Sequence, residues 1–281
     1  MRQYDILQRF LFEDSDIRGE LVHLKACINA LSERHPYPKP VLQLLSQALT
    51  AVSLLSATIK FEGSLILQTQ TDGAIHLLVA QSDNNQHIRG LAKWDEQRLQ
   101  DTHLLGNGHL AITIIPDNAK EQRYQGVVSM SEESLSLTLE TYFAQSEQLM
   151  TKVWLSADDN ISAGLLLQKL PNTQKQTWEY WEHIEILANT LTEKELLYLE
   201  NEEILRRLFH EEQVRLFEPT PVIFQCQCSI EKMEQAIVTF GKQAIEEILQ
   251  TQQVVDVTCE FCNRRYEFDR VDIARIFVSH S

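Results

Sequence analysis

The first two thirds of the chain carry short apolar runs separated by turn residues, interrupted by two stretches of helical periodicity. Alternation of apolar and polar residues between turn signals predicts strands. The expected strands are 4–13, 17–29, 64–70, 75–81, 87–94, 110–115, 123–130, 149–156 and 163–170. Helical spacing predicts one helix from the proline-rich turn at 35–40 to Ile59 and another over 132–145. Adjacent hairpins with few long helices predict an α+β fold built on a mostly antiparallel sheet.

Beyond residue 178 the pattern becomes helical and strongly acidic. Residues 178–218 hold eleven glutamates against four basic residues, which accounts for −7 of the net charge of −15. The first predicted helix carries an apolar face, and a capping box at Thr192 and Glu195 predicts the start of a second. The apolar positions are Trp178, Trp181, Ile184, Ala188 and Leu191 in the first helix, and Leu197, Ile204, Leu205, Leu208 and Phe209 in the second.

Two interpretations of this acidic segment stay open. Its apolar faces need a neighbour, while its glutamates repel one another once that neighbour is lost, which describes a metastable linker. The alternative is a pair of ordinary amphipathic helices docked permanently on the rest of the protein.

Composition sets the class of protein. With 281 residues, 43% of them apolar, the chain can bury a sizeable core and is long enough for about two domains. Net charge −15 and a pI near 5.0 argue against a surface for nucleic acid or for an anionic membrane. We find no signal peptide pattern and expect no membrane span, so a cytoplasmic protein is expected.

Four of the five cysteines gather near the C-terminus as Cys226-x-Cys228 and Cys259-x-x-Cys262. Four clustered thiols predict one tetrahedral site for a soft metal, and zinc is the expected occupant. Structural disulfides and ordinary buried thiols are the alternatives. Disulfide frameworks belong to small secreted chains, and in a reducing compartment the metal-bound thiolate is the expected resting state.

The residues around the thiols support this prediction. The second pair lies between two β-type runs, 254–258 and 266–268, as a strand, tight turn and strand. Ser229 is a good N-cap for a helix over Ile230 to Ile248, so Cys228 sits where a helix N-terminus favours the thiolate. Because the module 221–281 is small, zinc binding would supply much of its folding free energy, and oxidation of the ligands could unfold it.

The remaining candidates receive structural roles. Cys27 lies in a predicted strand and is expected to be a small buried hydrophobic residue. The nine histidines show no ligand spacing with the thiols, so no histidine is assigned to the metal.

Two other functions compete with a metal-controlled switch. A nucleic-acid-binding zinc ribbon should be basic, whereas residues 219–281 carry nine acidic against six basic side chains. A thiol oxidoreductase using Cys259-x-x-Cys262 should place the first cysteine at a helix start, whereas a second strand is predicted after this pair.

Several short motifs, taken together, resemble the 33 kDa chaperonin family, the redox-regulated holdases of bacteria. The resemblance runs nearly end to end. The motifs are Lys60-Phe61-Glu62-Gly63, Gln68-x-Gln70-x-Asp72-Gly73, Arg89-Gly90-x-Ala92, Tyr124-Gln125-Gly126, Tyr142-Phe143-x-x-Ser146-Glu147-Gln148, Ala163-Gly164 with Gln168-x-Leu170-Pro171, and the two cysteine pairs.

The resemblance implies a function and a division of the chain. It implies an α+β substrate-binding core over 1–175, an acidic helical metastable linker over 176–220 and a zinc-binding redox-switch domain over 221–281. Cys226, Cys228, Cys259 and Cys262 would bind one Zn²⁺ when reduced. On oxidation, Cys226 would pair with Cys228 and Cys259 with Cys262, zinc would leave, and the switch domain and linker would unfold.

The same resemblance implies the partners. The oxidised form would be an ATP-independent chaperone, not an enzyme, that holds unfolding client proteins and tends to form a homodimer, whereas the reduced form would be an inactive monomer. Neither nucleic acid nor a membrane would be a partner.

Overall fold

The computed structural model describes residues 3–13, 15–59, 62–100, 103–118, 120–131, 134–171 and 178–279. The chain forms two compact units, Met1–Gln225 and Cys226–Ser281. Lys60 and Phe61 of the first motif, Glu132 at the predicted helix start and the predicted boundary at 175/176 lie outside the described residues.

Two sheets form the unit Met1–Gln225, and the first, which we call sheet A, is antiparallel throughout. Its strands lie in the order β10-β1-β2-β9-β8, and β11 also pairs with β1. The bounds are β1 Ile6–Phe12, β2 Ile17–Leu24, β8 Thr151–Ala157, β9 Ser162–Lys169, β10 Val214–Leu216 and β11 Thr220–Pro221.

The second sheet, sheet B, has the order β12-β5-β4-β3-β6-β7 and is antiparallel except for the β12–β5 pair. The bounds are β3 Gly63–Thr71, β4 Ile75–Asp83, β5 His87–Trp94, β6 Gly108–Pro116, β7 Tyr124–Met130 and β12 Ile223–Phe224, and a short helix η1, Glu96–Arg98, follows β5. The predicted α+β class and mostly antiparallel pairing are therefore confirmed.

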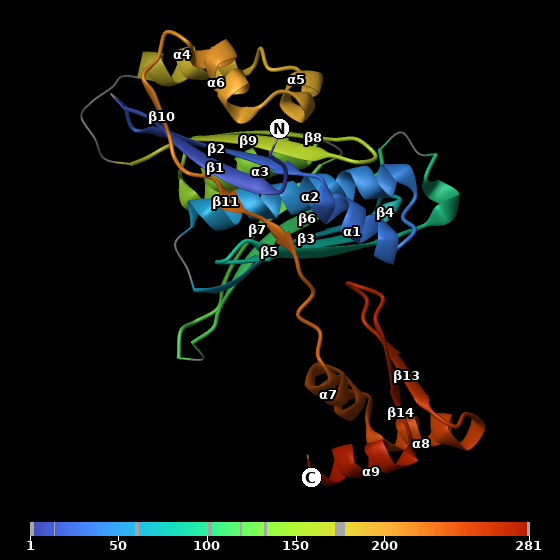
Figure 1. Cartoon of the computed structure of the whole chain (residues 1–281). Coiled ribbons are helices and arrows are strands. Elements are labelled where there is room, and N and C mark those ends of the chain that lie inside the picture. Colours follow the sequence, from blue (N-terminus) through green and yellow to red (C-terminus); the bar gives the residue numbers. More distant parts are fainter. Residues whose placement is uncertain are drawn as a thin grey trace. The chain divides into compact units, whose positions relative to one another are not determined.

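Helix α2, Lys39–Thr58, packs between the two sheets (Figure 1). Its residues are buried around nearly the whole helix, against apolar side chains of both sheets. By length and hydropathy this helix could cross a membrane, which the sequence analysis did not anticipate, but 72% of that stretch is buried inside the protein. Its position between the sheets accounts for its apolar character.

The predicted strand 17–29 is wrong beyond Leu24, because residues Ala26–Arg34 form helix α1. The carboxylate of Asp5 accepts backbone hydrogen bonds from Lys25, Ala26 and Cys27 at 2.8–3.1 Å and so caps this helix from a distant part of the chain. Cys27 therefore lies in a helix, although it is buried as expected.

The predicted helix over 132–145 is observed as α3, Leu135–Tyr142, which continues into the π-helical turn η2, Phe143–Glu147. The Glu147 carboxylate accepts hydrogen bonds from the hydroxyls of Tyr142 and Tyr124 at 2.9 and 3.0 Å. The motif that begins at Tyr124 and the motif that begins at Tyr142 thus meet at the Glu147 carboxylate, which joins this turn to β7.

The acidic segment covers the face of sheet A opposite α2 (Figure 1). It forms α4 Trp178–Ala188, α5 Glu193–Tyr198 and α6 Asn201–Phe209. The Thr192–Glu195 capping box is confirmed. The prediction of one continuous second helix is wrong, because α5 ends at Tyr198 and a new capping box at Glu200 and Glu203 begins α6.

Aromatic packing holds these helices to the sheet. Phe209 of α6 contacts Phe12 edge-on, with ring centroids 5.0 Å apart, and lies 6.5 Å from Phe10. Trp181, Ile184 and Ala188 of α4 are buried in the same cluster. Trp178, by contrast, is exposed, so it does not belong to the buried face predicted for it.

The unit Cys226–Ser281 contains α7 Ile230–Phe240, α8 Lys242–Thr251, β13 Val255–Thr258, β14 Arg265–Phe268 and α9 Arg270–Ser279. The single helix predicted after Ser229 is divided at Gly241, whose φ of 90° suits glycine. Helix α9 was not predicted.

Glu20 on β2 gives the first unit a measurable pH dependence. Its side chain is 1% exposed, and burial raises its pKa from 4.5 to about 8 despite the opposing charges of Arg18 and Arg9. Between these pH values the folded protein keeps a proton that the unfolded chain has lost, so its stability falls as pH rises through this window.

We therefore expect Glu20→Gln, which stays neutral, to gain stability relative to the wild type as pH rises from 5 to 8.5, by on the order of 3 kcal/mol. Urea unfolding followed by tryptophan fluorescence reports on this unit, since all four tryptophans lie within it. Glu33→Gln is the control, because it makes the same substitution at an exposed position. A difference between Glu20→Gln and wild type that does not vary with pH would contradict the prediction.

Candidate metal centre

The first thiol pair lies between the last strand of Met1–Gln225 and helix α7. Cys226 follows β12 by one residue, and Cys228 directly precedes the N-cap Ser229, whose hydroxyl accepts a hydrogen bond from the Lys232 amide at 3.4 Å. The Lys232 ammonium also donates to the carbonyl oxygen of Gln227 at 2.7 Å. The helix start thus fixes the loop between the two thiols, as the N-cap prediction required.

The second thiol pair lies in the turn of the β13–β14 hairpin. Thr258 pairs with Arg265 at the end of the ladder. The Cys259 amide donates to the Arg264 carbonyl at 2.9 Å, and the Asn263 amide donates to the Cys259 carbonyl at 2.8 Å. Asn263 has a φ of 58°, a left-handed conformation that asparagine tolerates well. The predicted strand, thiol turn and strand are confirmed.

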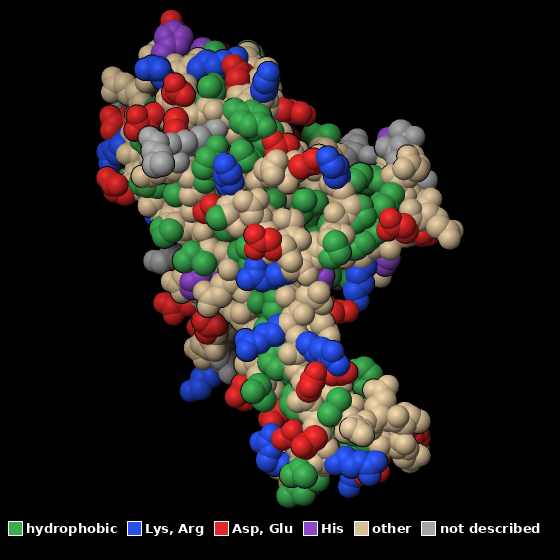
Figure 2. Space-filling model, turned by 45° about the vertical axis from the view of Figure 1, so that its right-hand side comes forward, with side chains coloured by type: hydrophobic (Ala, Val, Ile, Leu, Met, Phe, Trp, Pro, Cys, Tyr) green, Lys and Arg blue, Asp and Glu red, His purple; other side chains and the backbone are tan. Residues whose placement is uncertain are grey.

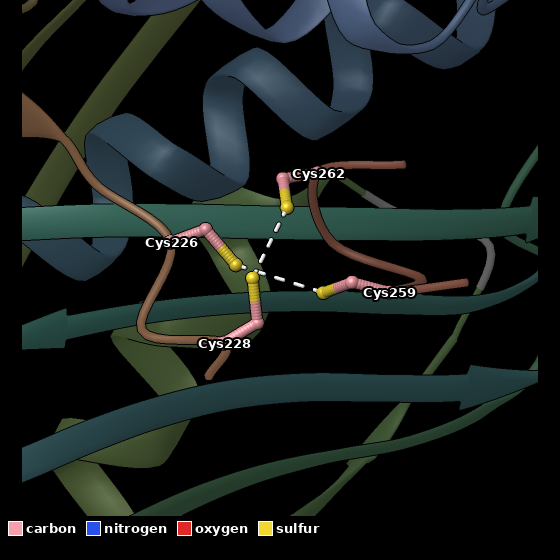
Figure 3. Close-up of side chains that lie close together, drawn as sticks. All are labelled: Cys226, Cys228, Cys259 and Cys262. Carbon is pink, nitrogen blue, oxygen red and sulfur yellow. Dashed lines mark hydrogen bonds between the residues drawn. The ribbon is translucent and has the colours of Figure 1, made fainter. Parts of the chain in front are cut away.

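The four sulfur atoms converge on one point (Figure 3). All four lie within 4.8 Å of one another, with the sulfurs of Cys226 and Cys259 3.7 Å apart and those of Cys228 and Cys262 3.5 Å apart. Four sulfurs at about 2.3 Å from a tetrahedral zinc ion would lie about 3.8 Å apart. All five cysteines are free thiols, and the separations exceed the roughly 2.05 Å of a disulfide. The donor set therefore fits zinc.

The environment gives the thiols different acidities before a metal binds. Burial works to raise the pKa of Cys228, but hydrogen bonds from Tyr266 and the other thiols outweigh it and lower the pKa to about 7. Burial raises the pKa of Cys259 and of Cys262, and the neighbouring thiols add to the effect. A metal must therefore displace protons from the site, so binding depends on pH.

A small apolar core supports the site. Eight buried residues form this cluster: Ile237, Ile245, Leu249, Val255, Tyr266, Phe268, Ile273 and Ile276. Such a core is modest for a unit of this size, so a bound metal would contribute a large share of its stability.

Sequence reasoning found the thiols but missed Tyr266. The Tyr266 hydroxyl donates a hydrogen bond to the Cys228 sulfur at 3.2 Å. The alternation of Tyr266 and Phe268 in a strand directly after the thiol turn is the signal that points both rings to one face. Within the part of the chain that the structure describes, the four thiols are the group of cysteine, histidine and carboxylate side chains suited to holding a metal.

Comparison with known proteins gives full-length matches. A sequence model of the family described as "Hsp33 protein" matches residues 5–269. A 33 kDa chaperonin of Nitrosococcus oceani is 49% identical over 281 residues, covering 99% of this chain and 96% of that protein. A 33 kDa chaperonin of Azotobacter vinelandii is 45% identical over 286 residues, covering 99% and 96%.

The fold is also found among solved structures. The crystal structure of a 33 kDa chaperonin, a heat shock protein 33 homologue, from Thermotoga maritima superposes with a TM-score of 0.85. It covers 99% of this chain and 100% of that one at 22% identity, and at this identity the likeness establishes the fold alone. Together with the match to the family model and the 45–49% identity to curated relatives, the site and fold lead to one conclusion: the chain belongs to the Hsp33 family of heat shock chaperones.

Proposed function

We propose that this chaperone is a redox-controlled, ATP-independent holdase whose switch is the four-thiol centre. In the reduced state Cys226, Cys228, Cys259 and Cys262 bind one Zn²⁺ and the protein is inactive. Oxidation releases the metal and produces the form that holds unfolding proteins. The convergence of four thiols at zinc-like spacing in a unit with a small core is the observation that carries the proposal.

Zinc would act here as a structural ion. It would supply roughly 10 to 16 kcal/mol of binding free energy at neutral pH, comparable to the whole stability of a small domain. Loss of two thiolates leaves too few ligands to hold it. The unit Cys226–Ser281 would then lose its fold, because eight buried side chains form its core.

The acidic segment is the second part of the proposed switch, and we assign 1–175, 176–220 and 221–281 to core, linker and switch. Beyond α6 the acidic segment attaches to sheet A through short strands, since β10 and β11 span three and two residues. The Arg207–Glu195 ion pair offsets part of its acidic excess, and the Glu212 carboxylate accepts a hydrogen bond from the Tyr180 hydroxyl. Once detached, the remaining glutamates repel one another and oppose re-docking.

Detachment would expose two complementary apolar faces. One is the outer face of sheet A, with Phe10, Phe12, Leu21, Leu165 and Leu167, and the other is the inner face of α4–α6. Unfolded proteins expose apolar segments, so either face could bind them without nucleotide chemistry. The oxidised protein would therefore bind clients by hydrophobic contact and tend to dimerise, whereas the reduced protein would remain monomeric.

The disulfides of the oxidised form follow from the family resemblance: Cys226 with Cys228, and Cys259 with Cys262. In the reduced fold all four sulfurs lie within 4.8 Å of one another, so the two thiols of either motif must approach to about 2.05 Å before a disulfide forms.

Two other functions receive less support. A nucleic-acid surface needs clustered basic residues, whereas on the face shown in Figure 2 Lys and Arg lie scattered among Asp and Glu. A thioredoxin-like centre would place Cys259 at a helix start, but the pair lies in a hairpin turn. We propose a non-enzymatic role in the cytoplasm, away from membranes.

The first test is metal content. The reduced wild type should bind one zinc ion per chain, and Cys262→Ser should lose most of it because three thiolates no longer close the tetrahedron. Elemental analysis after purification with a reductant measures this. Cys27→Ser, which removes a buried thiol in α1, should retain zinc. A reduced wild type free of metal at saturating zinc would contradict the zinc assignment.

The second test is the coupling of metal and activity. Treatment with hydrogen peroxide at mildly raised temperature should release zinc and produce anti-aggregation activity with the same time course, because one event removes the ligands and exposes the apolar faces. A chromogenic chelator follows the metal, and light scattering of a heat-denatured client follows activity. Full activity with zinc still bound would sink the proposed switch.

The third test concerns the linker. Phe209→Ala removes an aromatic anchor of α6, at a cost of about 3–5 kcal/mol, so the zinc-loaded reduced variant should restrain aggregation partly without oxidant. Ile186→Ala on α4 is the matched control, because Ile186 is 65% exposed and should leave the reduced form inactive. If neither reduced variant restrained aggregation, although Phe209→Ala is less stable, the helices would be permanently docked and the linker proposal would be wrong.

A further inference from the structure

We propose that Tyr266 is a positioning residue whose hydrogen bond to the Cys228 sulfur sets how readily oxidants release the metal. This inference rests on the proposed zinc switch and adds to it a residue outside the four ligands. Tyr266 lies on β14, and its hydroxyl oxygen lies 3.2 Å from the Cys228 sulfur, within the range of an O–H···S hydrogen bond.

The surroundings hold the tyrosine in this position. Its side chain is 9% exposed and packs in the core of the C-terminal unit with Phe268 and Val255. The Arg264 guanidinium lies over the ring at 5.3 Å from its centroid. The ring thus has little freedom to turn away from Cys228, and the hydrogen bond is built into the fold.

The contact joins the two halves of the site. Cys228 belongs to the segment before α7, whereas Tyr266 belongs to the hairpin that also carries Cys259 and Cys262. The Cys228 sulfur lies 3.5 Å from that of Cys262. One side chain of the hairpin therefore reaches across and fixes a ligand from the other segment, as outer partners commonly do in metal sites.

The chemical effect follows from the direction of the hydrogen bond. A thiolate that binds zinc would keep lone pairs that can accept a hydrogen bond, and the hydrogen bond withdraws electron density from the sulfur. In oxidation, the Cys228 sulfur gives two electrons to hydrogen peroxide: the O–O bond breaks, an S–O bond forms and hydroxide leaves. A second thiolate then displaces hydroxide from sulfur to form the disulfide. The hydrogen bond makes the first step slower.

Tyr266→Phe tests the inference because it keeps the ring and removes the hydroxyl. In the full-length, zinc-loaded, reduced protein we expect zinc affinity to fall about 10-fold or more, as for other outer partners of metal ligands. We expect the second-order rate of zinc release by hydrogen peroxide to rise several-fold, and the sulfur-to-metal charge-transfer band of the Co²⁺-substituted protein to shift. Chelator competition, a chromogenic chelator and absorption spectroscopy measure these quantities.

Thr239→Val is the matched control, because Thr239 bonds to the Gln235 carbonyl within α7 and removal of that hydroxyl should change none of these readouts. If the variant folds poorly, a ring-fluorinated tyrosine at position 266, a stronger donor, should slow zinc release instead. Wild-type affinity, release rate and spectrum in Tyr266→Phe would overturn the inference. Failure of the wild type itself to bind zinc would overturn the proposed function.

Discussion

Sheet A is apolar on both faces, and the rest of the structure follows from covering both. Strand β9 is buried along almost its whole length because Leu166 faces α2 while Leu165 and Leu167 face α4–α6. A sheet of this kind cannot leave either face in water without a large free-energy penalty. Helix α2 covers one face from within the core. The other face is covered by the short acidic segment, whose glutamates repel one another.

Helix α2 and the α4–α6 segment are held on the two faces of sheet A by different interactions. Helix α2 is enclosed by both sheets and tied by buried polar contacts, such as Thr50 to Ser162 at 2.7 Å. The α4–α6 segment instead packs on one side through aromatic residues such as Phe209 and Trp181. In the proposed switch this asymmetry would let the α4–α6 segment detach while α2 keeps the sheet intact.

Much of this architecture could be predicted from sequence where the signals were local. The alternation in β5 and the capping box at Thr192 identified their elements, and the spacing of Cys226, Cys228, Cys259 and Cys262 indicated a shared site. Predictions failed where a distant residue decided the outcome. Asp5 caps α1 across twenty residues of sequence, and the pairing of β12 with β5 joins residues more than a hundred positions apart. Tyr266 was missed because its partner sulfur belongs to the other thiol motif.

The chain leaves the first unit with almost no spacer. Gln225 donates its amide hydrogen to the Ile88 carbonyl at 2.9 Å, and the next residue is Cys226. A single residue, Gln225, therefore separates the first proposed metal ligand from β12 at the edge of sheet B, so any unfolding of the second unit would begin one residue from that strand. Inserting a few glycines after Gln225 would lengthen this connection while leaving every side chain of both units unchanged.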